Sequence, residues 1–381
     1  MNTAGSFRPA VARVDLAAVR HNVSLLKGMT PQGCRFMAVV KADAYGHGDL
    51  QVSRAALSAG ADCLGVALLE EAVRLREAGF DCGVNLLFET PPGAAAVAVE
   101  QGVTCSVYTE EYARALSDAA GILGRDALVH LKVDSGMHRV GVPADYAGSF
   151  AAMLAGLPGL VVEGVYTHFA SASEPADPFT DLQMDRFEEA AGAAETAVGH
   201  PLVRHAANSA GVIAFPRSHY EMVRVGISML GLPPAPGFPG SDALRPALSL
   251  VGEVAFVKKV GAGEGLCYGL TYAPRRDTFI ATVPLGYADG YSRLLSNRAQ
   301  VLIEGRRRQV VGVVAMDVFL VELGDEPVEV GTPVTMIGSD GSEEVTVDEL
   351  AGIIGTINYE VVCMISARVP RVYAGDEEGE A

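Results

Sequence analysis

The sequence predicts an α/β protein in which an N-terminal (β/α)₈ barrel is followed by a C-terminal, mostly β domain. A chain of 381 residues is too long for one compact core, which indicates two domains. The first two-thirds alternate short apolar runs with longer amphipathic segments, as strand–helix units around a parallel barrel do. The last third consists mainly of β-branched runs separated by turn residues, which is typical of an all-β domain.

The predicted barrel contains eight strand–helix alternations, which recur at intervals of roughly 20 to 40 residues. The expected strands are residues 35–40, 63–68, 84–88, 104–108, 128–133, 161–168, 202–207 and 222–227. Amphipathic periodicity predicts helices at residues 51–59, 69–78, 110–120, 144–154 and 181–198. An open, doubly wound sheet is the alternative, but the turn after the first strand lacks a G-x-G-x-x-G element.

The pattern changes at residues 232–240, where four prolines in nine residues exclude both a helix and a central strand. We therefore place the domain boundary there, with a barrel domain at 1–236 and a β-rich domain at 237–381. The strands expected in the second domain are 247–260, 278–284, 300–303, 310–323, 333–337 and 361–365, with one helix at 347–354. The acidic end, residues 375–381, is expected to be a disordered tail.

Composition excludes several classes of function. A formal net charge of −17 argues against nucleic acid or an anionic membrane as a partner, because both require a basic surface. The six cysteines are scattered without a C-x-x-C pair or metal-like spacing, so no metal is expected. No apolar run reaches about 20 residues and the amino terminus lacks the apolar region of a signal peptide. We expect a cytoplasmic protein.

The string Val-Val-Lys-Ala-Asp-Ala-Tyr-Gly-His-Gly, residues 39–48, is the most informative motif. A buried strand delivers Lys41 to the carboxyl edge of the sheet, where α/β barrels carry out their chemistry. Burial disfavours the charged form of an amine, so Lys41 would become available as a nucleophile or base. Tyr45 and His47 follow within one turn. The alternative is a lysine that extends from the strand end into solvent.

A second cluster runs from His130 to Gly141 and contains Lys132, Asp134 and Arg139. Strand alternation places Lys132 and Asp134 on the same face. The two side chains alone would be compatible with a simple ion pair, and that interpretation stays open at this point.

Further polar residues occur at the ends of the later barrel strands. His168 follows one strand, and a lone histidine in that position is often only a hydrogen-bonded core residue. Small residues at Asn208-Ser209 and Gly226-Ile227 stand where strands turn into helices, and phosphate sites in such barrels favour the last two strands. Arg224 lies on the last strand and is a further candidate site residue. It could instead form only a surface ion pair with Glu221.

Taken in order from about Val11 to Val372, these motifs resemble those of the alanine racemases, a family of fold-type III pyridoxal-phosphate enzymes. The resemblance implies a homodimer that interconverts L- and D-alanine by a two-base mechanism. Lys41 would carry the cofactor and act on D-alanine, and Tyr268 of the neighbouring subunit would act on L-alanine. The implied cofactor-binding residues are Lys41, Tyr45, His168, Asn208, Ser209, Arg224, Gly226, Ile227 and Tyr359.

The resemblance also implies roles around the substrate. Arg139 and Met316 would contact it, and Lys132 would be carbamylated and support Arg139. Tyr287, Arg293 and Ile357 would line the entry corridor. The sequence departs from the family at Val313, Ala315 and Val318, which leaves local polar contacts and substrate fit open. A racemase for serine or for a broader set of amino acids, a fold-type III decarboxylase and a cofactor-binding regulatory barrel are the alternatives. Supply of D-alanine for peptidoglycan is the expected role, with catabolism as the other possibility.

Overall fold

The computed structural model describes residues 7–375, so the acidic residues 376–381 lie outside the described part of the chain. The chain divides into two compact units. One contains the strand–helix alternations of residues 19–44 and 49–245. The other contains Tyr45–Gly48 and the described parts of residues 1–18 and 246–381. The N-terminal residues therefore belong to the β-rich unit, whereas our expected boundary at 236 and 237 groups them with the barrel.

The first unit contains a closed barrel of eight parallel strands. The order is β5-β4-β3-β2-β10-β9-β8-β6, and pairing of β5 with β6 closes the ring. Its strands are β2 (Arg35–Val39), β3 (Cys63–Val66), β4 (Gly83–Leu86), β5 (Thr104–Val107), β6 (Ala127–Asp134), β8 (Leu160–Tyr166), β9 (Val203–His205) and β10 (Met222–Val225). A short strand, β7 (Val142–Pro143), pairs beside β6. All eight predicted barrel strands are confirmed. They were recognisable because parallel strands are covered on both faces and read as continuous apolar runs.

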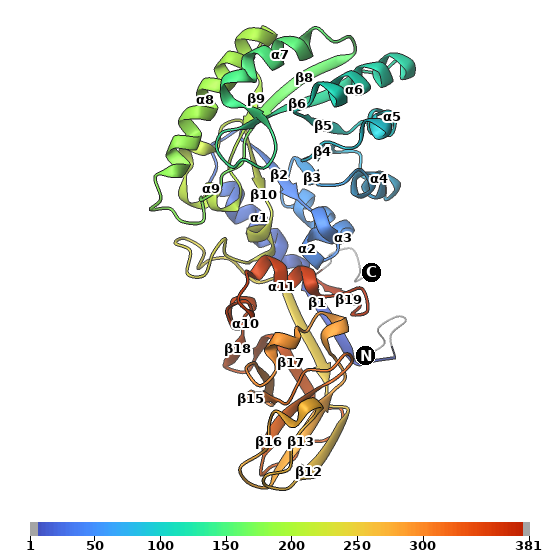
Figure 1. The fold of residues 1–381 in the computed structure, drawn as a ribbon, viewed down its shortest axis with the longest axis vertical. Helices are drawn as coiled ribbons and strands as arrows, with labels where there is room; N and C mark the ends of the chain where they lie inside the picture. Colours follow the sequence, from blue (N-terminus) through green and yellow to red (C-terminus); the bar gives the residue numbers. More distant parts are fainter. Residues whose placement is uncertain (1–6, 376–381) are drawn as a thin grey trace. The chain divides into compact units, whose positions relative to one another are not determined.

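Helices cover the barrel, and in Figure 1 helices α4 to α8 lie on the outer side of its strands. The five predicted helices are confirmed as α3 (Asp49–Ser58), α4 (Leu69–Glu77), α6 (Glu110–Leu123), α7 (Ala147–Ala155) and α8 (Phe179–Val198). The structure adds α1 (Leu16–Gly28), α2 (Lys41–Gly46), α5 (Ala95–Glu100) and α9 (Ser209–Ala214). Thr109 begins α6 by accepting a hydrogen bond from the Tyr112 N–H, the usual role of a threonine before a helix.

The second unit is built on a sheet of ten strands, in the order β12-β13-β16-β15-β14-β17-β11-β1-β19 with β18 paired to β17. They are β1 (Ala10–Asp15), β11 (Leu248–Glu253), β12 (Phe256–Val260), β13 (Thr278–Val283), β14 (Gln300–Ile303), β15 (Arg306–Val311), β16 (Phe319–Gly324), β17 (Pro333–Asp340), β18 (Glu343–Val345) and β19 (Arg371–Ala374). The mostly β character of this unit and the helix α10 (Val347–Ile354) agree with prediction.

The expected strands 247–260 and 310–323 each prove to be two strands with a break between them, and one further predicted strand is wrong. Residues 361–365 were expected to form a strand, but they belong to helix α11 (Asn358–Met364) and its end. The run Val-Val-Cys-Met-Ile is apolar enough for a strand, yet the buried positions are Asn358, Val361, Val362 and Ile365. That spacing of three and four residues places one face of a helix against the core.

Among the described residues, no helix has both the length and the apolar character needed to cross a membrane.

Candidate active site

Lys41 lies where strand β2 gives way to an unusual turn. The four residues after it, Ala42 to Tyr45, all have positive φ, between 50° and 55°. An L-residue in this left-handed region is destabilised by roughly 1–2 kcal/mol, so four in succession form a costly turn. The turn is supported by the Ala42 N–H, which donates to Glu71 Oε1 at 2.6 Å, and by the Ala44 N–H, which donates to Val40 O at 2.8 Å. Backbone strain of this kind concentrates at functional sites.

Glu71 holds the neighbouring loop as well. Its other oxygen, Oε2, accepts from the N–H groups of Ala67 and Leu68 at 2.8 and 3.0 Å. One carboxylate on α4 therefore joins the end of β3 to the left-handed turn that follows Lys41. The backbone on both sides of this strand edge is fixed by the same side chain.

A group of cations surrounds Tyr166 near the ends of the barrel strands. Lys132 Nζ lies 4.4 Å from the centroid of the Tyr166 ring, and Arg224 Cζ lies 5.2 Å from it. Burial lowers the pKa of Lys132 well below its usual range, and the charges of Arg224 and Arg139 lower it further. Burial also raises the pKa of the Tyr166 phenol to about 12, so this tyrosine stays neutral. Its hydroxyl lies 2.5 Å from Ser106 Oγ.

The described ion pairs do not include one between Lys132 and Asp134. Asp134 Oδ1 instead accepts from the N–H groups of Gly136 and His138, both at 3.0 Å. Its Oδ2 lies 3.2 Å from His138 Nδ1. The carboxylate therefore organises the loop after β6, and Lys132 is directed toward Tyr166. Arg139, on that loop, places its guanidinium carbon 5.4 Å from the ring centroid of Phe88.

Arg224 is the most completely bonded cation of this group. Its Nη2 donates to Thr167 O at 2.7 Å and to Ala206 O at 2.9 Å, and it lies 3.2 Å from His168 Nδ1. Its Nη1 lies 2.9 Å from His205 Nδ1. Burial lowers the pKa of Arg224 to about 10, which still leaves it protonated at neutral pH.

The pKa of His168 reflects the cations that lie near it. Burial lowers the pKa of His168 well below its usual range. The charges of Arg224, Lys132, Arg139 and Lys41 lower it further, in that order. His168 is therefore neutral, and four other predicted residues of the barrel unit, Lys41, Lys132, Arg139 and Arg224, contribute to its low pKa.

The last two barrel strands lead into a compact set of backbone donors. Asn208 precedes α9 and its side chain accepts from the Gly211 N–H at 3.0 Å. Ser209 Oγ accepts from the N–H groups of Gly226 and Ser228, both at 3.3 Å. Strand β10 ends beside it in the short helix η4 (Ile227–Leu230). The predicted residues Asn208, Ser209, Gly226 and Ile227 are thus held together. Small side chains, backbone N–H groups and a hydroxyl suit a phosphate.

The chain matches the family described as "Alanine racemase, N-terminal domain" over residues 14–234, and "Alanine racemase, C-terminal domain" over residues 247–373. The chain belongs to the alanine racemase family.

Individual relatives cover nearly the whole chain. It is 50% identical over 370 residues to the alanine racemase of Symbiobacterium thermophilum, which covers 97% of this chain and 98% of that protein. It is 41% identical over 379 residues to alanine racemase 1 of Bacillus subtilis, with coverage of 98% and 95%. The crystal structure of alanine racemase from Streptomyces lavendulae has a TM-score of 0.94, 39% identity, and coverage of 98% and 99%. The Bacillus anthracis enzyme with bound L-Ala-P has a TM-score of 0.91, 39% identity, and coverage of 98% and 97%.

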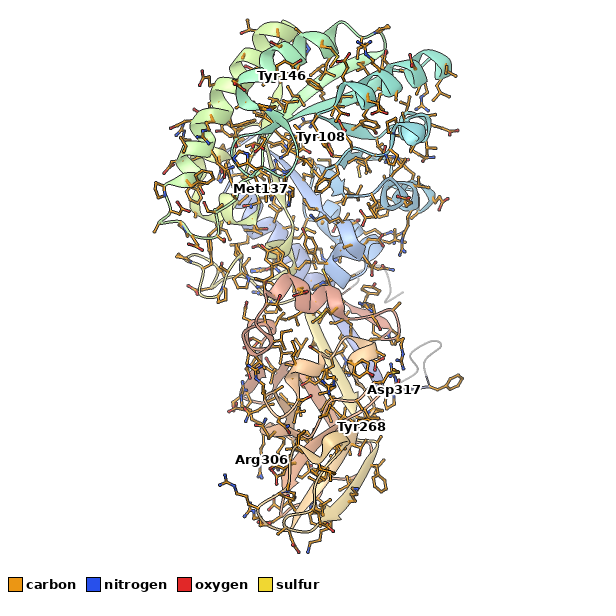
Figure 2. The ribbon with its side chains drawn as sticks, viewed as in Figure 1. Tyr108, Met137, Tyr146, Tyr268, Arg306 and Asp317 are labelled. Carbon is orange, nitrogen blue, oxygen red and sulfur yellow. The ribbon has the colours of Figure 1, made fainter. Side chains whose placement is uncertain are left out.

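Tyr268, which the family resemblance predicts as a site residue, lies in the β-rich unit (Figure 2). It begins the short helix η5 (Tyr268–Leu270) and its side chain is 72% exposed. The residues around it, Cys267, Gly269 and Leu270, have φ of 58°, 70° and 49°. Cys267 Sγ lies 3.1 Å from Val313 O, and Leu266 N–H donates to Tyr272 O at 2.8 Å. A tightly turned backbone therefore presents this phenol to solvent.

Other predicted residues of the β-rich unit come together by backbone pairing. The N–H of Tyr287 donates to Ala315 O, and that of Ala288 donates to Met316 O, both at 3.0 Å. These bonds join the predicted corridor segment to the predicted substrate segment. The two segments approach so closely that position 286 requires a glycine, since a Cβ there would lie 2.4 Å from Ala315 O.

Tyr45 and Tyr359, two tyrosines predicted to bind the cofactor, form an aromatic pair in the β-rich unit. Their ring centroids are 6.2 Å apart in an edge-on arrangement. Burial raises the pKa of Tyr359 to about 12, so its phenol remains a hydrogen-bond donor at neutral pH. Arg293 and Ile357 lie in the same unit and are exposed.

Sequence reasoning missed the bonds that Arg224 makes to the barrel. An arginine carries only donors, so a buried one requires several acceptors nearby. A buried arginine in a sequence therefore predicts that several acceptors lie near it in the fold. However, the acceptors are backbone carbonyls and two histidines, 19 and 56 residues away, which periodicity does not identify.

Proposed function

We propose that this protein interconverts L- and D-alanine with pyridoxal 5'-phosphate bound to Lys41, by a two-base mechanism in which Lys41 and Tyr268 serve the two faces of the substrate. The observation that supports this most directly is the position of Lys41. It lies at the carboxyl end of a barrel strand, before a strained left-handed turn, and its charge acts on His168 beside Arg224. In the proposal, residues 1–236 form the cofactor-binding domain and residues 237–381 supply Tyr268.

The residues fit the cofactor. Ser209 Oγ accepts two backbone N–H groups and keeps its own hydrogen to donate to a phosphate oxygen. Gly226, Ile227 and Asn208 provide small or backbone groups beside it, and in the proposal Tyr359 would add a neutral phenol donor. Arg224 would donate to the pyridine nitrogen, His168 would lie near the ring, and Tyr45 would contact the cofactor from the turn after Lys41. When bound, the cofactor withdraws electrons from the substrate Cα and so acidifies its proton.

Arg224 determines how strongly that withdrawal operates. A guanidinium with a pKa of about 10 donates a hydrogen bond at neutral pH but does not transfer its proton. The pyridine nitrogen would therefore stay unprotonated. A weaker electron sink suits racemisation, in which the proton is returned to Cα.

Proton transfer on both faces of Cα requires two bases on opposite sides. Lys41 would remove the Cα proton of D-alanine, and in the reverse direction it would donate the proton that forms D-alanine. Tyr268 would remove the Cα proton of L-alanine and would donate the proton that forms L-alanine. Arg139 would bind the substrate carboxylate and Met316 would contact the substrate. Tyr287, Arg293 and Ile357 would line the corridor through which it enters.

Exposed side chains of the β-rich unit, Tyr268 among them, support a composite site in a two-fold homodimer. Tyr268, Leu270, Met316 and Ile357 are 72%, 66%, 52% and 59% exposed. A second copy of the chain would cover them, and a two-fold dimer would contain two such sites. We further propose that the protein acts in the cytoplasm and supplies D-alanine for peptidoglycan precursors.

The purified protein, loaded with pyridoxal 5'-phosphate, should racemise alanine in both directions. Chiral chromatography with L-alanine, D-alanine and L-serine as separate substrates tests this. We expect alanine to be favoured over serine by roughly 10-fold or more, because a site fitted to a methyl group does not bond the serine hydroxyl. Equal rates with serine would favour the broader racemase, which the departures at Val313, Ala315 and Val318 leave open. Release of carbon dioxide from the substrate would indicate a decarboxylase.

Lys132 should be carbamylated in the active protein. Only a neutral amine adds carbon dioxide, and burial together with Arg224 and Arg139 holds the pKa of Lys132 far below its usual range. The product is an anion, and it would pair with Arg139 where an ammonium would repel it. A high-resolution density map from crystals grown with bicarbonate should show branched density at the Lys132 amine.

A kinetic experiment checks the same assignment. Lys132→Ala should lose most activity, on the order of 10- to 100-fold, and regain part of it with added acetate, which replaces the missing anion. Lys132→Arg is the control, because it fills the space with a cation and should not respond to acetate. Unbranched density, together with a Lys132→Ala variant that ignores acetate, would reject the carbamate.

A further inference from the structure

A line of buried polar side chains leads from Arg224 away from the predicted site. Arg224 Nη1 lies 2.9 Å from His205 Nδ1, and His205 Nε2 lies 2.8 Å from His130 Nδ1. His130 Nε2 then lies 3.3 Å from Glu163 Oε2. Arg224, His205 and His130 are 4%, 1% and 3% exposed, whereas Glu163 is partly exposed and pairs with Arg35 at 3.8 Å.

The chemistry of arginine fixes the direction of every bond in this line. A guanidinium can only donate, so His205 Nδ1 must accept. The proton of a neutral His205 ring is then on Nε2 and is donated to His130 Nδ1. The proton of His130 is in turn on Nε2, and it is donated to the Glu163 carboxylate.

Both histidines are neutral, as this assignment requires. Burial lowers the pKa of His205 well below its usual range, and the charge of Arg224 lowers it further. Burial also lowers the pKa of His130, which outweighs the opposing effect of Glu163. A second proton on either ring would place two donors face to face.

The surrounding barrel makes room for this line. The His205 ring stacks on Tyr166, with centroids 4.6 Å apart and an angle of 7° between the planes. The pairing of β6 with β8 shifts register between Val129 and His130, so the strand departs from regular geometry where His130 begins. On β8, a Cβ at Gly164 would lie 2.8 Å from His130 Nε2. The absence of a side chain there leaves space for the imidazole.

We infer that His130 and Glu163 are positioning residues, which hold His205 in its Nε2–H tautomer and thereby fix the guanidinium of Arg224. The Glu163 carboxylate selects the Nε2–H form of His130, and His130 imposes the same form on His205. Reversal of either tautomer would turn an N–H toward Arg224 and displace its Nη1. The inference rests on the proposed function, in which Arg224 donates to the cofactor's pyridine nitrogen.

Neutron diffraction from crystals of the deuterated holoenzyme tests the tautomers directly. We expect a deuteron on Nε2 of both His205 and His130 and none on either Nδ1. The same measurement on the cofactor-free protein should give the same result, because the line of bonds is complete in the protein alone. A deuteron on Nδ1 of His205, or on both of its nitrogens, would overturn the inference.

Kinetics and spectra of variants test the consequence. His130→Phe keeps a ring but removes the acceptor for His205, and should lower kcat by roughly 10- to 100-fold with KM changed less than about threefold. The visible absorbance of the bound cofactor should shift, because the donor to its ring nitrogen has moved. Glu163→Gln keeps an acceptor oxygen and should retain kcat within about threefold, whereas Glu163→Leu should lose about 10-fold. His219→Phe is the control, since His219 is also buried but its ring bonds to Val212 O at 3.0 Å, outside the line from Arg224 to Glu163.

The two proposals fail in different ways. If the unmodified holoenzyme does not racemise alanine, the proposed function is wrong whatever the tautomers are. If it does, and His130→Phe is folded with unchanged kcat and spectrum, the positioning role alone is wrong. The neutron result decides the matter where His130→Phe does not fold.

Discussion

Lys41→Ala should abolish racemisation of both enantiomers, with a loss of at least about 10⁴-fold, because in the proposed mechanism the same amine binds the cofactor and serves as a base. The cofactor should also be removed by dialysis, which its covalent bond to Lys41 would otherwise prevent. Chiral chromatography measures the first effect and the visible absorbance of the dialysed protein measures the second. The two effects should appear together.

The structure fixes the backbone that carries Lys41. The chain beyond it enters the left-handed turn of Ala42 to Tyr45, which is fixed by Glu71 and leaves the strand end little freedom to shift. Lys259→Ala is the matched control. Lys259 is an exposed lysine that pairs with Asp277 at 3.1 Å, and its loss should leave both activity and cofactor retention unchanged. A Lys41→Ala protein that still racemises alanine at the normal rate would exclude the proposed mechanism.

The barrel could be predicted from the sequence because its strands are short and buried on both faces. The strand at residues 10–15 could not be predicted, since β1 is stabilised by pairing with strands far along the chain. Ala10 pairs with Gly252 and Ala12 pairs with Arg371, and neither pairing leaves a local pattern. Residues 361–365 failed for another reason: a short apolar run fits both a strand and a helix, and only the burial of Asn358 reveals the helical face.

The candidate site also has features that the sequence predicted and features that it did not. Lys41, Lys132, Arg139 and Arg224 were identifiable because each lies in a distinctive string. The left-handed turn was not, since Ala-Asp-Ala-Tyr contains no glycine to announce positive φ. The line from Arg224 to Glu163 was also invisible, because His130 and His205 are 75 residues apart and meet only when β6 and β9 are placed in the barrel. Motifs identify the groups that do chemistry, whereas their supporting bonds depend on the fold.

Tyr268→Phe should lower turnover from either enantiomer by roughly 10²- to 10⁴-fold, because in the proposed mechanism each direction needs the phenol once, as base or as acid. In deuterated water, exchange of the Cα proton of unreacted L-alanine should fall further than exchange of D-alanine, since Lys41 still serves the D face. Tyr272→Phe is the matched control. It lies four residues along the same loop, and its hydroxyl donates to Glu322 Oε2 at 2.5 Å within the β-rich unit. Equal losses in the two exchange rates would contradict the assignment of Tyr268 to the L face.

Mixing two inactive variants tests whether Tyr268 serves the neighbouring subunit. Lys41→Ala subunits keep Tyr268, and Tyr268→Phe subunits keep Lys41. If each site combines Lys41 of one subunit with Tyr268 of the other, a mixed dimer contains one intact site and one doubly altered site. Random reassociation of equal amounts makes about half of the dimers mixed, so activity should return to about a quarter of the unmodified level. If both residues of a site came from one subunit, every site in the mixture would lack one base and no activity would return. The exposure of Tyr268 in the single chain favours the first outcome, because the proposed base must be covered in a site that excludes water, and a second copy of the chain would provide that cover.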